Sequence, residues 1–259
     1  MRSQGSITVA LVAVAQLAAA CGCGHTGTPA PIDEAEPSLV GQEGDDLPPP
    51  TVDTPPPAGS AGAALLAEVD RELQRKTAST YSHKTHVDEA SGTFEYDCSG
   101  LLRYALSRAA PDALDPVKSM AGRPPRSAEL VTFLQGIPLG QRAGRWQRVG
   151  RVRDLAPGDV VVWLKPADSR STNTGHTMIV HGSPTPEPGH ADAYVVPVVD
   201  STALPHVPGD AREEAHQTGL GSGEIVLIVD GDGAPVRYRW SRGARSREKV
   251  TTIALGRLR

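Results

Sequence analysis

From residue 61 onward, the first part of the chain carries hydrophobic residues at helical spacing. The first pattern predicts a helix with one apolar face and one charged face. The apolar face consists of Leu65, Leu66, Val69 and Leu73. The same spacing predicts a helix over 99–110, which Pro111 ends, and a short helix over 127–134. The segment 111–126 between them holds five prolines or glycines and is expected to be a loop.

Further along the chain, the pattern changes to short β-rich runs bounded by glycine, proline and aspartate. These runs span 159–163, 177–180, 194–199 and 224–229. Turns are predicted at 157–158 and 230–233. Because the helices come first and the strands afterwards, the order favours an α+β fold over an alternating α/β fold.

The first 20 residues have the pattern of a secretory signal peptide. Arg2 precedes an apolar stretch of 14 residues, Ile7 to Ala20, which is short for a membrane span. Cys21 follows three alanines, which resembles a bacterial lipoprotein signal, although the same small residues fit a cleavage site that releases a soluble protein. Gly22 resembles the residue after the cysteine in outer-membrane lipoproteins. We therefore expect an exported protein, lipidated at Cys21, anchored to the outer membrane and facing the periplasm or the cell surface.

Residues 21–60 are expected to form an extended linker. This segment contains nine prolines and seven acidic residues and no aromatic residue, so it cannot bury enough surface to fold. It is either a stalk that holds the domain away from a membrane or a spacer of no particular length. The folded domain is then 61–259. There 25 basic and 23 acidic residues nearly balance, so the acidity of the chain belongs to the linker.

The composition excludes several classes of protein. A net charge of -4 does not indicate a nucleic-acid binder, and three cysteines cannot build a disulfide framework. The glycine-rich run 219–223 is followed by a strand instead of a helix, so it lacks the dipole of a phosphate loop. His83, His86 and Asp88 are more typical of a polar loop than of a metal site. We therefore expect a monomer with no cofactor and no bound metal.

Cys98 is the candidate nucleophile. It is the only cysteine of the domain, so it cannot form a disulfide there, and it stands immediately before an amphipathic helix. The positive end of a helix dipole and its unpaired N–H groups favour the reactive thiolate and can hold an oxyanion. The alternative is a small buried hydrophobic residue.

A nucleophilic cysteine needs a base and a group that orients the base. His176 begins one predicted strand, where a histidine is held rigidly and partly exposed, and Asp200 ends the next. If these strands pair, the two side chains can lie side by side. Each residue alone has an ordinary alternative, a surface histidine and an aspartate that caps a turn. Together with Cys98, they predict a catalytic triad.

Three segments, in this order, resemble the NlpC-type papain-like cysteine peptidases, bacterial enzymes that cut peptide or amide bonds in peptidoglycan. The segments are DCSG at 97–100, LAPGDVV at 155–161 and GHTMIV at 175–180. The resemblance covers about 78–230 and implies a papain-like fold, with N-terminal helices packed on a C-terminal antiparallel β-sheet. It implies Cys98 as nucleophile, His176 as base and, on the next strand, Asp200 in a place where the family usually has histidine. It also implies Tyr81 near the oxyanion, and Ser99 is expected beside the same site.

The chain departs from the family in the residues after Tyr81, in a longer loop between the catalytic strands and in the segment after Asp200. In that segment, we expect His206, with Arg212, to contact a carboxylate of the substrate or to lie in a surface loop. The basic stretch 237–259 either contacts an anionic polymer or is a solvated face. We expect an exported cysteine hydrolase that acts on peptidoglycan stem peptides. The alternatives are a wall-binding lipoprotein without activity and a papain-like amidase or acyltransferase for a protein or lipid.

Overall fold

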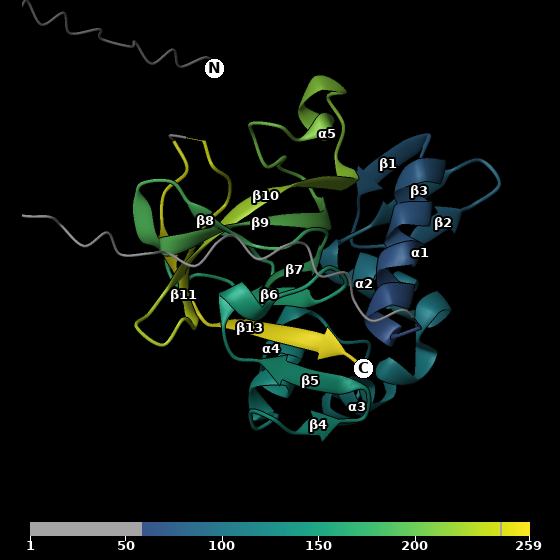
Figure 1. The fold of residues 1–259 in the computed structure, drawn as a ribbon. Coiled ribbons are helices and arrows are strands. Elements are labelled where there is room, and N and C mark those ends of the chain that lie inside the picture. Colours follow the sequence, from purple (N-terminus) through teal and green to yellow (C-terminus); the bar gives the residue numbers. More distant parts are fainter. Residues whose placement is uncertain (1–58, 244) are drawn as a thin grey trace, which may run out of the picture. The chain divides into compact units, whose positions relative to one another are not determined.

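Figure 1 shows a computed structural model of the chain, which describes residues 59–243 and 245–259. The expected signal peptide, the lipidation site at Cys21 and almost all of the expected linker lie outside the described residues. Within the described residues, no helix is both long enough and apolar enough to cross a membrane.

The N-terminal layer begins with α1 (Ala61–Arg75), where the hydrophobic spacing predicts a helix. The hydroxyl of Ser60 accepts a hydrogen bond from the amide of Ala63, which caps this helix. A small sheet follows, with the order β1-β3-β2, made of β1 (Ala78–Tyr81), β2 (His86–Asp88) and β3 (Thr93–Tyr96). The chain then enters α2 (Cys98–Ala109). The expectation of helices alone in this region was therefore wrong, because a three-stranded sheet separates the first two.

The segment 111–126, expected as a loop, contains two short helical pieces. These are a 3-10 helix over Pro111–Ala113 and α3 (Asp115–Ala121). A proline stands in the first turn of each, where its missing N–H is not needed and its fixed φ favours a helix. The third predicted helix is present as α4 (Ser127–Gly136).

The described residues also form a large antiparallel sheet, which together with the helices makes the fold α+β, as the order of patterns predicts. Its order is β12-β11-β10-β9-β7-β6-β13-β5-β4, and β8 pairs with β9. The strands are β4 (Arg142–Ala143), β5 (Trp146–Val149), β6 (Val160–Leu164), β7 (Gly175–Val180), β8 (Thr185–Glu187), β9 (His190–Thr202), β10 (Gly219–Val229), β11 (Pro235–Arg239), β12 (Lys249–Val250) and β13 (Ile253–Leu258). A 3-10 helix (Val152–Asp154) precedes β6, and α5 (Ala211–Glu214) lies between β9 and β10.

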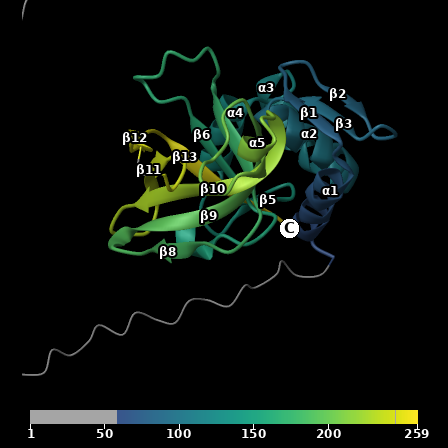
Figure 2. The same cartoon turned by 90° about the horizontal axis from the view of Figure 1, so that it is seen from above.

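The central strands are buried on both faces, which explains their continuous valine and isoleucine runs. On one face, Val162, Ile179 and Val199 share a core with residues of α1, α2 and α4. On the other face, Val161, Met178 and neighbours from β9, β10 and β11 form a second core with β13. Figure 2 shows β11 and β12, at one end of this sheet, on the left, and α1 with the small sheet on the right. Strands β7 and β9 lie in the middle of this sheet, with a core on each face.

In the described part of the chain, the carboxyl group of Glu72 lies in the core of the helical layer. It is fully buried, and the hydroxyl of Tyr96 donates to Glu72 Oε2 over 2.6 Å. Burial raises the pKa of Glu72 to about 7, against the opposing effect of the Tyr96 hydrogen bond. The folded protein therefore binds this proton more tightly than the unfolded chain does. Its stabilising contribution is complete below the ordinary value of 4.5 and is lost as the pH rises through about 7.

We expect Glu72→Gln to stabilise the protein above neutral pH. The amide keeps the oxygen that accepts from Tyr96 but has no charge to desolvate, so the gain is up to about 3 kcal/mol at about pH 8 and vanishes near pH 4. Urea unfolding of both proteins at the two pH values measures this gain in stability. An equal effect at the two pH values would contradict the titration of Glu72.

Candidate active site

Cys98 occupies the first position of α2, as the sequence predicts. Asp97 caps this helix: its Oδ1 accepts from the amide of Gly100 over 2.6 Å, and its carbonyl accepts from Leu101. The Cys98 side chain is 6% exposed, and its Sγ lies 3.8 Å from the hydroxyl of Ser127 at the start of α4. The thiol thus lies at the N-terminus of α2 and beside the N-terminus of α4.

The amides of Cys98 and Ser99 point out of the first turn of α2. Neither has an acceptor within the described part of the chain, because the Asp97 oxygens take the next two amides. These N–H groups are the available donors for an oxyanion. The Ser99 hydroxyl itself donates to Asp97 and accepts from Arg103, so this side chain supports the cap.

The structure brings His176 and Asp200 together. The backbone ladder between β7 and β9 ends at Ile179 and Val199, and just beyond it the two side chains bridge the strands. His176 Nε2 lies 2.5 Å from Asp200 Oδ2. Because Nε2 is engaged by Asp200, Nδ1 is the nitrogen left for Cys98. His176 and Asp200, with Cys98, supply the three residue types of a Cys-His-Asp triad.

Cys98 and His176 are electrostatically coupled. Burial alone would lower the pKa of His176, but the attraction of the Cys98 sulfur and the hydrogen bond to Asp200 raise it from 6.5 to about 10. Burial alone would likewise raise the pKa of Asp200, but His206 and the two imidazole hydrogen bonds hold it well below its usual range. At neutral pH, the imidazolium of His176 therefore faces an ionised carboxylate and the sulfur.

We expect this coupling to appear in the titration of His176. Its stabilising contribution is complete below pH 6.5 and is lost as the pH rises through about 10. In Cys98→Ala, the strongest attraction is removed, so the midpoint of His176 moves down toward the ordinary value. Histidine ring NMR across this range checks both proteins, with the exposed His190 as an internal reference. Identical midpoints in the two proteins would contradict a Cys98–His176 pair.

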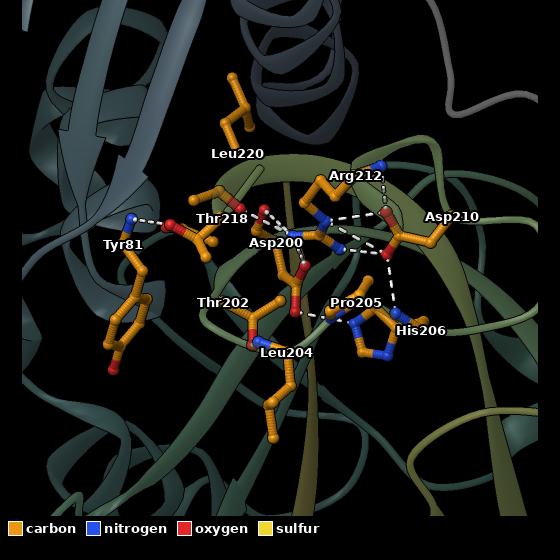
Figure 3. A network of polar contacts seen from close by, with 12 residues as sticks. Tyr81, Asp200, Thr202, Leu204, Pro205, His206, Asp210, Arg212, Thr218 and Leu220 are labelled. Carbon is orange, nitrogen blue, oxygen red and sulfur yellow. Dashed lines mark hydrogen bonds and ion pairs between the residues drawn. The ribbon is translucent and has the colours of Figure 1, made fainter. Parts of the chain in front are cut away.

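The expected role of His206 and Arg212 in contacting substrate, or in a surface loop, was wrong. Both side chains are completely buried, and Figure 3 shows them directed toward Asp200. His206 Nε2 lies 2.9 Å from Asp200 Oδ2. Arg212 Nη1 lies 2.9 Å from Asp200 Oδ1 and forms an ion pair with it, but the angles do not meet those of a hydrogen bond. Arg212 also donates to both oxygens of Asp210. The segment after Asp200 thus returns two buried side chains to the Asp200 carboxylate.

The glycine-rich run 219–223 makes room for these buried side chains. A Cβ on Gly221 would lie 2.5 Å from Arg212 Nε, and one on Gly223 would lie 2.7 Å from His206 Cβ. Gly219, two residues earlier, has a φ of +85° and packs against Ser79 of the small sheet. The glycines therefore form a notch on one face of β10, which is a packing role and not a phosphate site.

Two hollows flank the triad. A polar hollow of about 130 Å³ contains Cys98, Ser99, Ser127 and Arg126 in its lining. A more apolar hollow of about 260 Å³ contains His176 and the rings of Trp163, Tyr238 and Trp240. Tyr81, Asn173 and Gly175 line both. The surface beside Cys98 is therefore more polar than the surface beside His176.

Tyr81 lies at the boundary between the hollows, where its amide binds Thr218 Oγ1 (Figure 3). Its hydroxyl accepts a hydrogen bond from Asn173 Nδ2 over 3.1 Å. Burial first, and then the negative charges of Cys98 and Asp97, raise the pKa of Tyr81 to about 12. The phenol therefore keeps its proton near Cys98, as a donor to an oxyanion requires.

His176, Asp200 and His206 also form a group with the residue types of a metal site. Their nearest ligand atoms all lie within 4.8 Å of one another. The separations of 2.5 and 2.9 Å are those of direct hydrogen bonds, whereas two ligands of a tetrahedral zinc ion stand about 3.3 Å apart. The group thus fits a proton-bonded chain better than a metal site.

The basic stretch 237–259 is largely neutralised by the fold. Five of its basic side chains form ion pairs with acidic residues elsewhere in the structure or within the stretch. One of the five is Arg257, which pairs with the buried Asp159. These contacts account for most of the charge without an external polymer.

Comparisons with known proteins place few constraints on function. No family model matches the chain, and no solved structure matches it. An uncharacterized protein, R653, of Acanthamoeba polyphaga mimivirus is 34% identical over 128 residues. The match covers 43% of this chain and 56% of the viral protein, so the chain spans about half the length of that relative.

Proposed function

We propose that the chain is a papain-like cysteine hydrolase, exported and lipid-anchored at Cys21, that cleaves peptide or amide bonds. One observation carries this proposal: a thiol at a helix N-terminus is coupled to an imidazole whose other nitrogen binds a buried carboxylate. This is the arrangement by which a cysteine is activated and its base oriented. The packing of α2 against β7 and β9 supports a papain-like relation of helix to sheet.

Hydrolysis would proceed in two steps. In the first, the Cys98 thiolate attacks the amide carbonyl carbon, and the C–S bond forms as the carbonyl electrons move to the oxygen. The amides of Cys98 and Ser99 and the Tyr81 hydroxyl stabilise this oxyanion. The C–N bond then breaks, and the leaving amine takes the proton from His176 Nδ1.

In the second step, water hydrolyses the thioester. His176 Nδ1 takes a proton from the attacking water, the C–S bond breaks, and a carboxylic acid and the free cysteine are released. Throughout, Asp200 accepts from Nε2 and keeps the ring oriented with Nδ1 toward Cys98. Neither step requires a cofactor.

A peptidoglycan stem peptide is the substrate that the sequence resemblance favours. The test is digestion of purified peptidoglycan by the full chain, with products identified by mass spectrometry and Cys98→Ala as the matched control. Release of a defined muropeptide that depends on Cys98 supports the proposal. No release, from a folded protein whose Cys98 still reacts with iodoacetamide, moves the substrate elsewhere. No release and an inert Cys98 favour a wall-binding protein without activity.

The apolar hollow favours a second candidate, an amidase or acyltransferase that acts on a protein or lipid amide. His176 lines this hollow and protonates the leaving group, so the hollow lies on the leaving-group side of the cleft. Its rings include Trp163 and Tyr238, stacked with centroids 4.0 Å apart. Cleavage of N-acyl amides that improves with an apolar leaving amine, and declines in Trp240→Ala, would select this candidate.

A further inference from the structure

A second imidazole, that of His206, lies directly behind the triad. It is completely buried, and both of its nitrogens meet oxygen: Nδ1 lies 2.7 Å from the Trp240 carbonyl, and Nε2 lies 2.9 Å from Asp200 Oδ2. The same Asp200 oxygen receives His176 Nε2. Figure 3 shows His206 and Arg212 approaching Asp200 from one side. One carboxylate thus joins two imidazoles and a guanidinium.

The hydrogen bonds of His206 determine where its protons lie. A carbonyl oxygen can only accept, so Nδ1 must carry a hydrogen. An ionised Asp200 also can only accept, so Nε2 must carry one too. The competing arrangement places the second proton on Asp200, but Arg212 Nη1 stands 2.9 Å from Oδ1 and favours the ionised carboxylate. A neutral His206 would direct a lone pair at that carboxylate over 2.9 Å.

The surrounding charges accommodate an imidazolium at this position. Asp200 and Asp210 carry two negative charges, which Arg212 and a protonated His206 balance. Asp210 also accepts from the His206 amide over 2.8 Å. The Trp240 ring stacks on His206 with centroids 4.3 Å apart and an interplanar angle of 29°, a geometry that favours a cation. The other charged groups facing this cluster are His176, through Asp200, and the half-buried Lys76 beside Arg212.

We propose that His206 is a positioning residue that donates through both ring nitrogens and, together with Arg212, keeps Asp200 ionised and aligned on His176. It extends the triad to a chain of Cys98, His176, Asp200 and His206. The donated proton of His206 lowers the basicity of Asp200, so the carboxylate orients His176 without withdrawing its Nε2 proton. Nδ1 then remains the nitrogen that exchanges a proton at Cys98. The catalytic part of this inference rests on the proposed function, whereas the protonation of His206 does not.

The first test counts the protons on His206. The full chain is labelled with ¹⁵N-histidine, and the His206 signals are assigned by their loss in His206→Gln. We expect both ring nitrogens to carry hydrogen at about pH 7, because each faces an oxygen that can only accept. A single protonated nitrogen there overturns the proposal. The protons are counted on the unmodified chain, and if the variant does not fold, contacts between the His206 and Trp240 rings assign the signals instead.

The second test measures the positioning role in the Cys98→Ala background, where His176 titrates at an accessible pH. His206→Gln keeps a donor but removes the charge, so Asp200 should hold the His176 proton more tightly. We expect the His176 midpoint to rise by about one pH unit. His181→Gln, which changes an exposed histidine paired with Asp70, should leave the midpoint unchanged. An unmoved midpoint in folded His206→Gln overturns the role. If both tests succeed and no amide is cleaved, the proposed function fails and the protonation of His206 stands.

Discussion

Cys98→Ala is expected to lower the rate of amide hydrolysis by on the order of 10⁵-fold while leaving the protein folded. Without the thiol, the imidazole of His176 has no nucleophile to activate, and the amides of α2 stabilise only the slow attack of water. The Asp97 cap of α2 does not involve the sulfur, so the helix should persist. Loss of one buried sulfur is expected to cost about 1 kcal/mol of stability.

The measurement combines the initial rate on the substrate identified by product analysis with thermal unfolding of both proteins. Ser127→Ala is the matched control, because it removes the hydroxyl 3.8 Å from the sulfur and leaves the triad intact. Its rate should fall by about tenfold at most. A Cys98→Ala protein that keeps about a tenth of the rate would show that Cys98 is not the nucleophile.

The parts of the fold that the sequence predicts are those with a strong local pattern. The two amphipathic helices, 61–75 and 98–109, and the central strands bury long apolar runs, so periodicity reveals them. The small sheet escapes prediction because its strands have only three or four residues each and mostly polar ones. β13 escapes because it lies in a stretch whose basic residues dominate the composition. Its apolar positions, Ile253 and Leu255, are buried nonetheless.

The residues of the candidate site likewise fall into those that local sequence reveals and those that it does not. Cys98 and His176 each stand at the start of a regular element, and Asp200 stands near the end of one, so local sequence identifies them. Ser127 and Asn173 come from distant segments, and only the tertiary fold brings them to the cleft. His206 lies between prolines in a segment typical of a surface loop, and composition does not reveal its burial. The signal in the sequence that could have indicated this burial is the alternation of glycines at 219, 221 and 223. A strand face without side chains leaves room for side chains from another segment to pack against it.

Arg212→Met is expected to lower the free energy of unfolding by about 3–5 kcal/mol, because it leaves two buried carboxylates without their shared cation. Arg212 is 1% exposed and donates to the Gly219 carbonyl over 2.7 Å as well as to Asp210, so methionine loses several interactions at once. Guanidinium unfolding measures the loss. Arg237→Met is the matched control: that arginine is 39% exposed and pairs with Glu248, and its replacement should cost about 0–1 kcal/mol.

Adding Asp210→Asn to Arg212→Met shows whether lost charge compensation or lost packing causes the decrease in stability. If the uncompensated charge is the main cost, neutralising Asp210 should recover part of the stability, and the two changes should couple by about 1–3 kcal/mol. If the cost is only lost packing, the second change should add to the first. The comparison therefore distinguishes an electrostatic role of Arg212 from a space-filling one. An electrostatic role would account for a charged side chain in the notch that the glycines of β10 leave open beside Asp200.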